Sequence, residues 1–239
     1  MSELDQKKIW RHFQGEGRDS FLAARPRLRW LAGQIRRWAN GAKPVRVLNI
    51  GVGDGYFEQC SLDQGCEVHS LDPDEEAIAQ VSNQGVCGVV GVIEKMPFEA
   101  GAFDVVVASE VLEHLDAVQG AAGLAEIARV LAPRGVFLGT VPYNEDLSLG
   151  ETVCPCCGVR FHRWGHQRSF DLASMRQELE GRFIVRELRR TAFPDLKRGL
   201  VGKVKGWARI ALAMAGQQIA SPQIFFAASP RSASSAQAS

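Results

Sequence analysis

The chain has 239 residues, of which 46% are hydrophobic and 23% are charged. This allows one α/β domain with a sizeable core, with or without a small insertion. No run of about 18 apolar residues is present and the N-terminus is polar, which argues against a membrane span and a secretory signal and favours a cytoplasmic protein. The net charge of +1 is uneven, at +7 for residues 1–50, −15 for 51–159 and +9 for 160–239. An anionic partner would meet the ends of the chain, although solvated faces explain the same pattern.

The sequence divides into a helical start, one main domain and a short tail. Residues 1–43 have apolar side chains at near-helical spacing, which predicts an N-terminal helical cap. The main domain covers 44–229 and includes a Cys/His loop at 150–170 and a basic insertion at 195–220. Residues 230–239 are mostly Ser and Ala, and we expect this tail to be disordered.

Short apolar runs alternate with helical stretches through the main domain. This alternation predicts an α/β fold, in which helices cover both faces of a doubly wound, mostly parallel sheet. Helices are expected at 75–83 and 120–131. The seven predicted strands are 45–50, 66–71, 87–92, 103–108, 135–141, 183–190 and 223–228.

A glycine-rich turn follows the first predicted strand, with Gly51, Gly53 and Gly55 at alternate positions. Glycine adopts positive φ and lets a ligand approach the backbone closely. The helix after the turn would direct its first amide groups at that ligand. A dinucleotide fingerprint has a further glycine where this chain has Tyr56, which disfavours a nicotinamide or flavin cofactor.

Asp72 ends the second predicted strand, where a carboxylate can accept hydrogen bonds from both hydroxyls of a ribose. The alternative is an ordinary helix N-cap, because Asp72 and Pro73 begin a segment that starts a helix well. The glycine turn that precedes Asp72 favours the ribose interpretation.

Five segments follow one another between residues 45 and 142. They are L-N-I-G-V-G-D-G, V-H-S-L-D, E-K-M-P-F, F-D-V-V-V-A-S-E-V-L-E-H-L and A-R-V-L-A-P-R-G-V-F-L-G-T-V-P. Together, and in this order, they resemble the small class I S-adenosylmethionine (SAM)-dependent methyltransferases, a family that includes ubiquinone-biosynthesis and type 11 methyltransferases. The resemblance implies a Rossmann-like seven-stranded sheet, SAM over the carboxyl ends of its first strands, and methyl transfer as the reaction.

The same resemblance implies where the cofactor would lie. The glycine turn and the end of the fourth strand would surround its methionine part, the end of the second strand would hold the ribose, and the loop after the third strand would flank the adenine. The implied contacts are Gly51, Gly53, Gly55, Ser109, Glu110, Asp72, Pro73, Ile93 and Glu94.

Two residues depart from the family's pattern. Asn49 replaces the acidic residue that usually precedes the glycine turn, and Val92 stands where the family commonly has an Asp that contacts the adenine. These departures leave a SAM-binding interaction module without turnover as an alternative to an enzyme.

The acceptor determines whether the reaction needs a general base. A hydroxyl or phenol acceptor needs one, and the candidates are His114, Tyr143, His162 and His166. His114 also has a structural interpretation, because the family often has a hydrogen-bonding histidine there. We expect a small-molecule, saccharide or lipid-linked acceptor, and the alternative is RNA or protein methylation through the basic flanks.

A cysteine–histidine cluster is the least ordinary feature of the chain. Cys154 and Cys157 have C-x-x-C spacing, and His162 and His166 are four residues apart, as on one helical face. These four residues predict a closed structural zinc site that would stiffen a loop over the acceptor pocket. A reactive or redox-active thiol and plain packing are the alternatives, because the spacing from Cys157 to His162 is tight.

The segment 197–212 mixes basic and apolar residues. Such a segment suits an anionic membrane surface, which would place the protein at the inner face of a membrane, or a phosphorylated acceptor. An amphipathic helix packed on the domain is the alternative. The sequence has no aromatic-rich RNA-binding motif, so nucleic acid is not the expected partner.

Overall fold

The computed structural model describes residues 19–39, 41, 43–193 and 222–231. The basic segment 197–212, and with it the predicted membrane contact, lies outside these residues. Within the described ranges, no helix combines the length and apolar character needed to cross a membrane.

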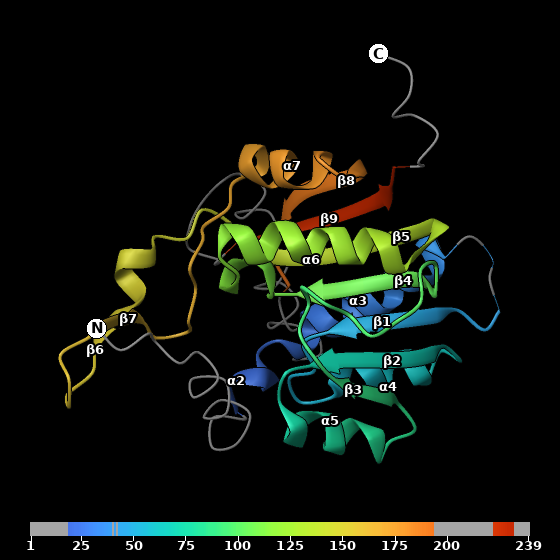
Figure 1. Cartoon of the computed structure of the whole chain (residues 1–239), viewed down its shortest axis with the longest axis horizontal. Helices are drawn as coiled ribbons and strands as arrows, with labels where there is room; N and C mark the ends of the chain where they lie inside the picture. Colours follow the sequence, from blue (N-terminus) through green and yellow to red (C-terminus); the bar gives the residue numbers. More distant parts are fainter. Residues whose placement is uncertain (1–18, 40, 42, 194–221, 232–239) are drawn as a thin grey trace, which may run out of the picture.

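A seven-stranded sheet forms the centre of the molecule (Figure 1), with strand order β3-β2-β1-β4-β5-β9-β8. Neighbouring strands are parallel except for β9, which is antiparallel to both β5 and β8. The prediction of a doubly wound, mostly parallel sheet is therefore confirmed. The strands are β1 (Arg46–Ile50), β2 (Glu67–Asp72), β3 (Cys87–Val90), β4 (Phe103–Ser109), β5 (Leu131–Pro142), β8 (Phe183–Thr191) and β9 (Gln223–Pro230).

Helices cover both faces of the sheet because the central strands are apolar on both sides. One core cluster includes buried residues of α6 and α7, and the other includes those of α3, α4 and α5. Figure 1 shows α6 and α7 together on the near face. The helices are α2 (Asp19–Leu22), α3 (Arg25–Trp38), α4 (Tyr56–Leu62), α5 (Glu75–Ser82), α6 (Ala117–Val130) and α7 (Leu172–Glu180), with 3-10 turns η1 (Leu112–His114) and η2 (Leu147–Gly150).

Side chains at the helix starts explain why α5, α6 and α7 begin where they do. Asp74 accepts hydrogen bonds from the amides of Glu76 and Ala77 at the start of α5. Asp116 and Asp171 form capping boxes at the starts of α6 and α7. The N-cap of α5 is therefore Asp74 rather than Asp72.

β5 and β9 pack closely at Gly139. A Cβ at Gly139 would overlap the ring of Phe226 and would lie 2.7 Å from the carbonyl oxygen of Ala108. Glycine is therefore required where β5 passes between β4 and β9.

A two-stranded hairpin lies outside the main sheet. β6 (Glu151–Val153) pairs antiparallel with β7 (Arg160–His162), and the cysteines occupy the turn between them. The pairing of Glu151 with His162 places His162 at the base of the hairpin, whereas Val153 and Arg160 pair next to the turn.

Several boundaries differ from the sequence-based expectation, among them the end of β3 at Val90 rather than 92 and the start of α6 at Ala117 rather than 120. β5 begins at Leu131, directly where α6 ends, rather than at 135. β9 continues through Ser229 and Pro230, which pair with Ile184 and Phe183, so the sheet includes the first residue of the predicted tail. Cross-strand pairing extends both strands beyond their apolar runs.

Candidate functional site

The glycine turn lies at the carboxyl end of β1, where the order of the strands reverses. The φ angles of Gly51, Gly53 and Gly55 are 83°, 61° and 75°, in the region that side chains disfavour. The amide of Gly51 donates to the carbonyl of Leu71 in β2 at 2.9 Å, which holds the turn against the end of the neighbouring strand. Ligands of doubly wound sheets bind at such a reversal point.

Asp72 is buried beside this turn with 5% of its surface exposed. Its Oδ2 accepts a hydrogen bond from the amide of Val52 at 2.9 Å, and its Oδ1 accepts one from the amide of Asp74 at 2.9 Å. These two bonds fix the carboxylate. A carboxylate oxygen has more than one acceptor direction, so an oxygen that accepts an amide can also accept a hydroxyl.

Glu58 is a buried acidic residue beneath the turn that is not among the residues predicted from the sequence. It lies on α4, fully buried, and its Oε1 accepts hydrogen bonds from Asn49 Nδ2 at 2.7 Å and Ser70 Oγ at 2.8 Å. Burial raises the pKa of Glu58 to about 7, against the opposing effect of these two hydrogen bonds. Position 49 therefore lacks the family's acidic residue, but an acidic side chain is still present beneath the turn, on α4, nine residues later. In the sequence, only the amide side chain of Asn49 indicated that a buried acceptor could lie beneath the turn.

Glu58→Gln is expected to flatten the pH dependence of stability. With its folded pKa raised from 4.5 to about 7, the wild-type side chain holds its proton in the folded state while the unfolded chain releases it. The free energy of unfolding should therefore fall between about pH 4.5 and 7, by up to about 3 kcal/mol from this group. Urea unfolding at several pH values measures it, with exposed Glu76→Gln as control. The same slope in wild type and Glu58→Gln would contradict the assignment.

The N-terminal helices cover the glycine turn from the other side. A Cβ at Gly53 would lie 3.2 Å from the ring of Phe21 on α2, and one at Gly51 would lie 3.1 Å from Val111. Arg25 of α3 forms a salt bridge with Asp54 at 3.0 Å. A side chain at Gly51 or Gly53 would fill the narrow space between the turn and the side chains of Val111 and Phe21 that pack against it.

The residues of the loop after β3 differ in their exposure to solvent. Ile93 is buried and would contact a Cβ at Gly123 of α6, so its side chain packs into the core rather than over the sheet edge. Val92 is 45% exposed, Glu94 is half-buried, and Pro73 at the end of β2 is exposed.

The end of β4 brings polar groups next to the turn. Ser109 Oγ lies 3.0 Å from Thr140 Oγ1 of β5 and accepts a hydrogen bond from Arg27 Nε at 2.9 Å. A second nitrogen of Arg27 lies 3.6 Å from Glu110 Oε2. Glu110 has a φ of 58°, which turns the chain sharply at this edge. Arg27 lies on α3, 82 residues before Ser109, and no local pattern in the sequence indicates this contact.

Comparisons with known proteins agree with this geometry. Residues 48–139 match the family model described as a methyltransferase domain. A malonyl-[acyl-carrier protein] O-methyltransferase of Enterobacter lignolyticus is 33% identical over 105 residues, 43% of this chain and 41% of that protein. An uncharacterised methyltransferase of Mycobacterium tuberculosis is 29% identical over 115 residues, 47% and 46% of the two chains. The match covers less than half the length of these curated relatives.

Solved structures extend the likeness to the whole fold. A 1,6-didemethyltoxoflavin-N1-methyltransferase of Burkholderia thailandensis, solved with S-adenosylhomocysteine, has a TM-score of 0.69 at 17% identity, over 95% of this chain and 88% of that one. A putative sarcosine dimethylglycine methyltransferase of Galdieria sulphuraria has a TM-score of 0.61 at 16% identity, over 84% and 83%. The chain contains a class I SAM-dependent methyltransferase domain. The predicted family, fold and cofactor are therefore confirmed.

The histidines of this methyltransferase domain gather at the same edge of the sheet. His114 is buried in η1, its ring centroid 4.6 Å from that of His166, and the ring of His166 stacks on His162 at 4.7 Å. Glu145, which follows β5, hydrogen-bonds His166 Nδ1 through Oε2 at 2.5 Å. Burial, and then the nearby His166, lower the pKa of His114 to about 3. His114 is therefore neutral and weakly basic at physiological pH, which argues against its role as a general base.

Tyr143 is half-buried at the end of β5, where it forms a bridge with Phe170, and the guanidinium of Arg190 lies 5.3 Å from the centre of its ring. These contacts hold the side chain beside the sheet edge. Its role as a base stays a prediction.

The predicted zinc ligands are only partly brought together. His162 and His166 are neighbours, and the thiols of Cys154 and Cys157 contact each other in the turn. Among the described residues, however, neither cysteine belongs to a group of three or more possible ligands whose atoms lie within 4.8 Å of one another. The hairpin explains this, because successive residues of an extended strand rise by about 3.3 Å and His162 lies at the opposite end of β7 from the turn. Within the turn, the amides of Cys157 and Cys156 lower the pKa of the Cys154 thiol.

Proposed function

We propose that this chain transfers the methyl group of SAM to a small-molecule, saccharide or lipid-linked acceptor. The observation that carries the proposal is the meeting of three positive-φ glycines and the buried Asp72 carboxylate at the reversal point of the sheet. This combination provides a close approach to the backbone and a fixed pair of acceptor atoms. Both fit an amino-acid nucleoside such as SAM.

Different residues around the turn would bind different parts of the cofactor. The oxygens of Asp72 accept the amides of Val52 and Asp74 and would also accept the ribose hydroxyls. The backbone of Gly51 and Gly53 would lie along the methionine part, and Ser109 and Glu110 would face its far end. Pro73 and Glu94 would border the ribose and adenine through the loops that follow β2 and β3, and Ile93 would support the second loop from the core.

The reaction requires positioning more than acid–base chemistry. The sulfonium of SAM supplies an electrophilic methyl group when it is bound. The chain itself then has to align an acceptor atom with that methyl group and exclude water, which can supply much of the acceleration. The acceptor would approach over the edge formed by the ends of β4 and β5, where Ser109, Thr140 and Tyr143 lie.

Two comparisons support an acceptor that is small or linked to a carrier. One relative is a malonyl-[acyl-carrier protein] O-methyltransferase, and one structural neighbour binds 1,6-didemethyltoxoflavin together with S-adenosylhomocysteine. The basic segment 197–212 is the sequence feature that favours a phosphorylated or lipid-linked version of such an acceptor.

Calorimetric titration of the purified full chain with S-adenosylhomocysteine tests the proposal. We expect one saturable site per chain, and ligand at about 100 times its dissociation constant should stabilise the fold by about 2.7 kcal/mol. Methyl-labelled SAM offered with a panel of small, saccharide and lipid-linked acceptors should then label one class. A well-folded chain that binds no S-adenosylhomocysteine would contradict the proposal.

A further inference from the structure

Glu113 is a buried carboxylate beside the proposed acceptor edge. It lies in η1 with 1% of its side chain exposed, and neither carboxylate oxygen has a hydrogen-bond partner among the residues that the structure describes. Buried charges in proteins are paired, hydrogen-bonded or bound to a metal, because an isolated buried carboxylate is strongly unfavourable. Glu113 therefore points to a missing partner.

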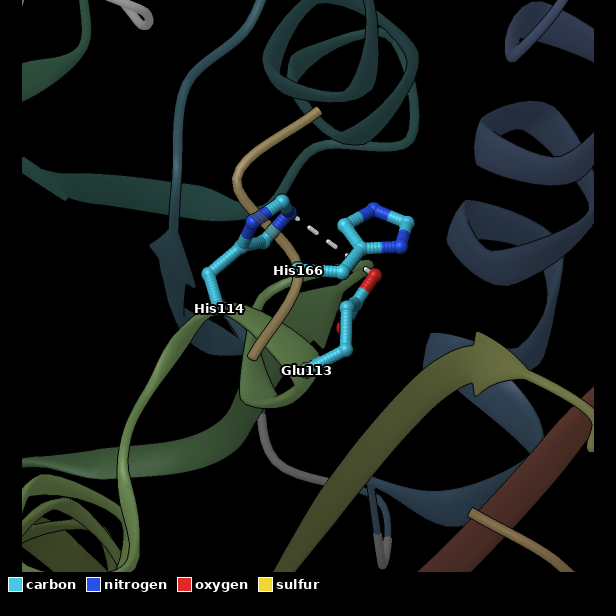
Figure 2. A group of neighbouring side chains, drawn as sticks. All are labelled: Glu113, His114 and His166. Atoms are coloured by element: carbon cyan, nitrogen blue, oxygen red, sulfur yellow. Dashed lines mark ion pairs between the residues drawn. The ribbon is translucent and has the colours of Figure 1, made fainter. Parts of the chain in front are cut away.

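Two histidines converge on Glu113, as Figure 2 shows. One ligand atom from each of Glu113, His114 and His166 can be chosen so that all three lie within 4.8 Å of one another. Nε2 of His114 is 3.9 Å from Glu113 Oε1. His114 is adjacent to Glu113 in η1, whereas His166 arrives on the segment between β7 and α7.

Main-chain hydrogen bonds hold the two segments together. The amides of Gln167 and Arg168 both donate to the carbonyl of Glu113, at 2.8 and 3.1 Å. Gln167 Nε2 donates to the carbonyl of His114 at 2.7 Å, and the ring of His114 hydrogen-bonds the backbone of Gly165. The three side chains are thus supported by rigid backbone contacts, as a preformed site requires.

Glu145 sets the orientation of His166. A carboxylate accepts, so the 2.5 Å hydrogen bond to Glu145 places the proton of His166 on Nδ1 and leaves Nε2 as the ring's electron-pair donor. Metal-binding histidines typically donate their second ring N–H to a carboxylate in this way. His166 is therefore prepared as a ligand, with Glu145 behind it.

His162 and Glu145 form a second group with His166 that fits a metal less well. Nδ1 of His162 accepts the amide of His166 at 3.1 Å, so the proton of a neutral His162 lies on Nε2 and neither nitrogen is left to bind a cation. Glu145 is already engaged by His166. The first group is the better site.

The burial of Glu113 agrees with this choice. Neither of its carboxylate oxygens has a hydrogen-bond partner within the described part of the chain, and a cation bound there would satisfy the oxygens and neutralise the charge.

We propose that Glu113, His114 and His166 bind a divalent first-row transition-metal cation. Two imidazoles and one carboxylate favour such ions over Mg²⁺ and Ca²⁺, which prefer oxygen ligands throughout. A three-ligand set of this kind also leaves coordination positions open. This site uses His166 but not the cysteines, and so differs from the predicted zinc site.

The site specifies the acceptor class, a step that rests on the proposed function. A cation with open positions polarises a bound oxygen and lowers the pKa of its proton, so the matching acceptor carries a hydroxyl group. The hydroxyl proton would pass to solvent, the oxygen would form the new bond to the methyl carbon, and the carbon–sulfur bond would break to release S-adenosylhomocysteine.

Cobalt titration of the full chain tests the site without any assay of activity. Metal is first removed by chelator, and Co²⁺ is then added while the visible absorption and the melting temperature are followed. We expect one Co²⁺ per chain, a ligand-field spectrum typical of nitrogen and oxygen ligands, and a rise in melting temperature.

Matched variants identify the ligands. Glu113→Gln keeps the size of the side chain and removes a buried charge, so this variant should fold. We expect its Co²⁺ affinity to be lower than that of wild type by at least about 100-fold. His166→Gln should lower Co²⁺ affinity by a similar factor. Glu145→Gln should weaken binding by about 10- to 100-fold, as expected for a residue that orients a ligand. His69→Gln and the double variant Cys154→Ser/Cys157→Ser should bind as wild type does.

Three results would overturn the proposal: no Co²⁺ binding to folded wild type, unchanged affinity in Glu113→Gln, or a sulfur-to-cobalt charge-transfer band that disappears in the double cysteine variant. Titration of the same metal-free protein with S-adenosylhomocysteine separates the two proposals. Cofactor binding without Co²⁺ binding rejects the metal site and retains the proposed function. Co²⁺ binding without cofactor binding supports the metal site and rejects the proposed function.

Discussion

Asp72→Ala is expected to weaken S-adenosylhomocysteine binding by at least about 100-fold, or about 2.7 kcal/mol. The variant removes the carboxylate that we propose accepts both ribose hydroxyls, and hydrogen bonds to a charged acceptor are worth about 1.5–3 kcal/mol each. Calorimetry on folded protein measures the change. Asp72→Asn gives a second test at nearly constant volume, because an amide nitrogen cannot accept a hydrogen bond.

Asp74→Ala is the matched control for Asp72→Ala. Asp74 caps α5 through the amides of Glu76 and Ala77, so its loss should lower stability by about 1 kcal/mol and leave cofactor affinity unchanged. If Asp72→Ala and Asp72→Asn both bind S-adenosylhomocysteine as wild type does, Asp72 serves only to tie Val52 and Asp74 together.

Gly139→Val is expected to lower the free energy of unfolding by about 3 kcal/mol, at the upper end of the usual range for overpacking. A side chain there would overlap Phe226 and approach the carbonyl of Ala108, and both neighbours are fully buried in the central strands. The shift in urea midpoint at constant slope measures the loss.

Gly33→Ala is the opposite case in the same protein. Gly33 lies within α3, its φ is not positive, and within the described part of the chain nothing is within 4 Å of an added Cβ. Alanine there should stabilise the protein by about 0.8–1 kcal/mol through helix propensity. Equal effects of the two substitutions would show that close packing of β5 against β9 does not limit residue choice at Gly139.

The sequence determined the elements that depend on local pattern. Apolar runs such as 45–50 and 103–108 bury both faces of a strand, and their alternation with helical segments permits few topologies other than a doubly wound sheet. The glycine turn was equally readable, because positive φ at Gly51, Gly53 and Gly55 is a property of residue type. The fold class followed from these patterns, and the family and the cofactor followed from the resemblance of the five segments between residues 45 and 142 to class I methyltransferases.

The boundaries and the site needed contacts that no local pattern contains. β9 extends through Pro230 because β8 pairs with it. Arg27 reaches Ser109 across 82 residues, and Glu58 meets Asn49 only because α4 folds back over β1. In each case the partner is chosen by packing rather than by spacing along the chain.

The histidine cluster shows the difference most clearly. Spacing alone grouped His162 and His166 with Cys154 and Cys157, since all four lie within 13 residues. The tertiary structure instead holds the cysteines in the turn of the β6–β7 hairpin and brings His166 to Glu113, 53 residues earlier, through backbone hydrogen bonds from Gln167 and Arg168. Residue type and periodicity are local properties, so the sequence indicates which chemical groups the chain carries. Which of those groups meet depends on the folded arrangement, because buried charges and hydrogen bonds are satisfied between segments that are distant along the chain.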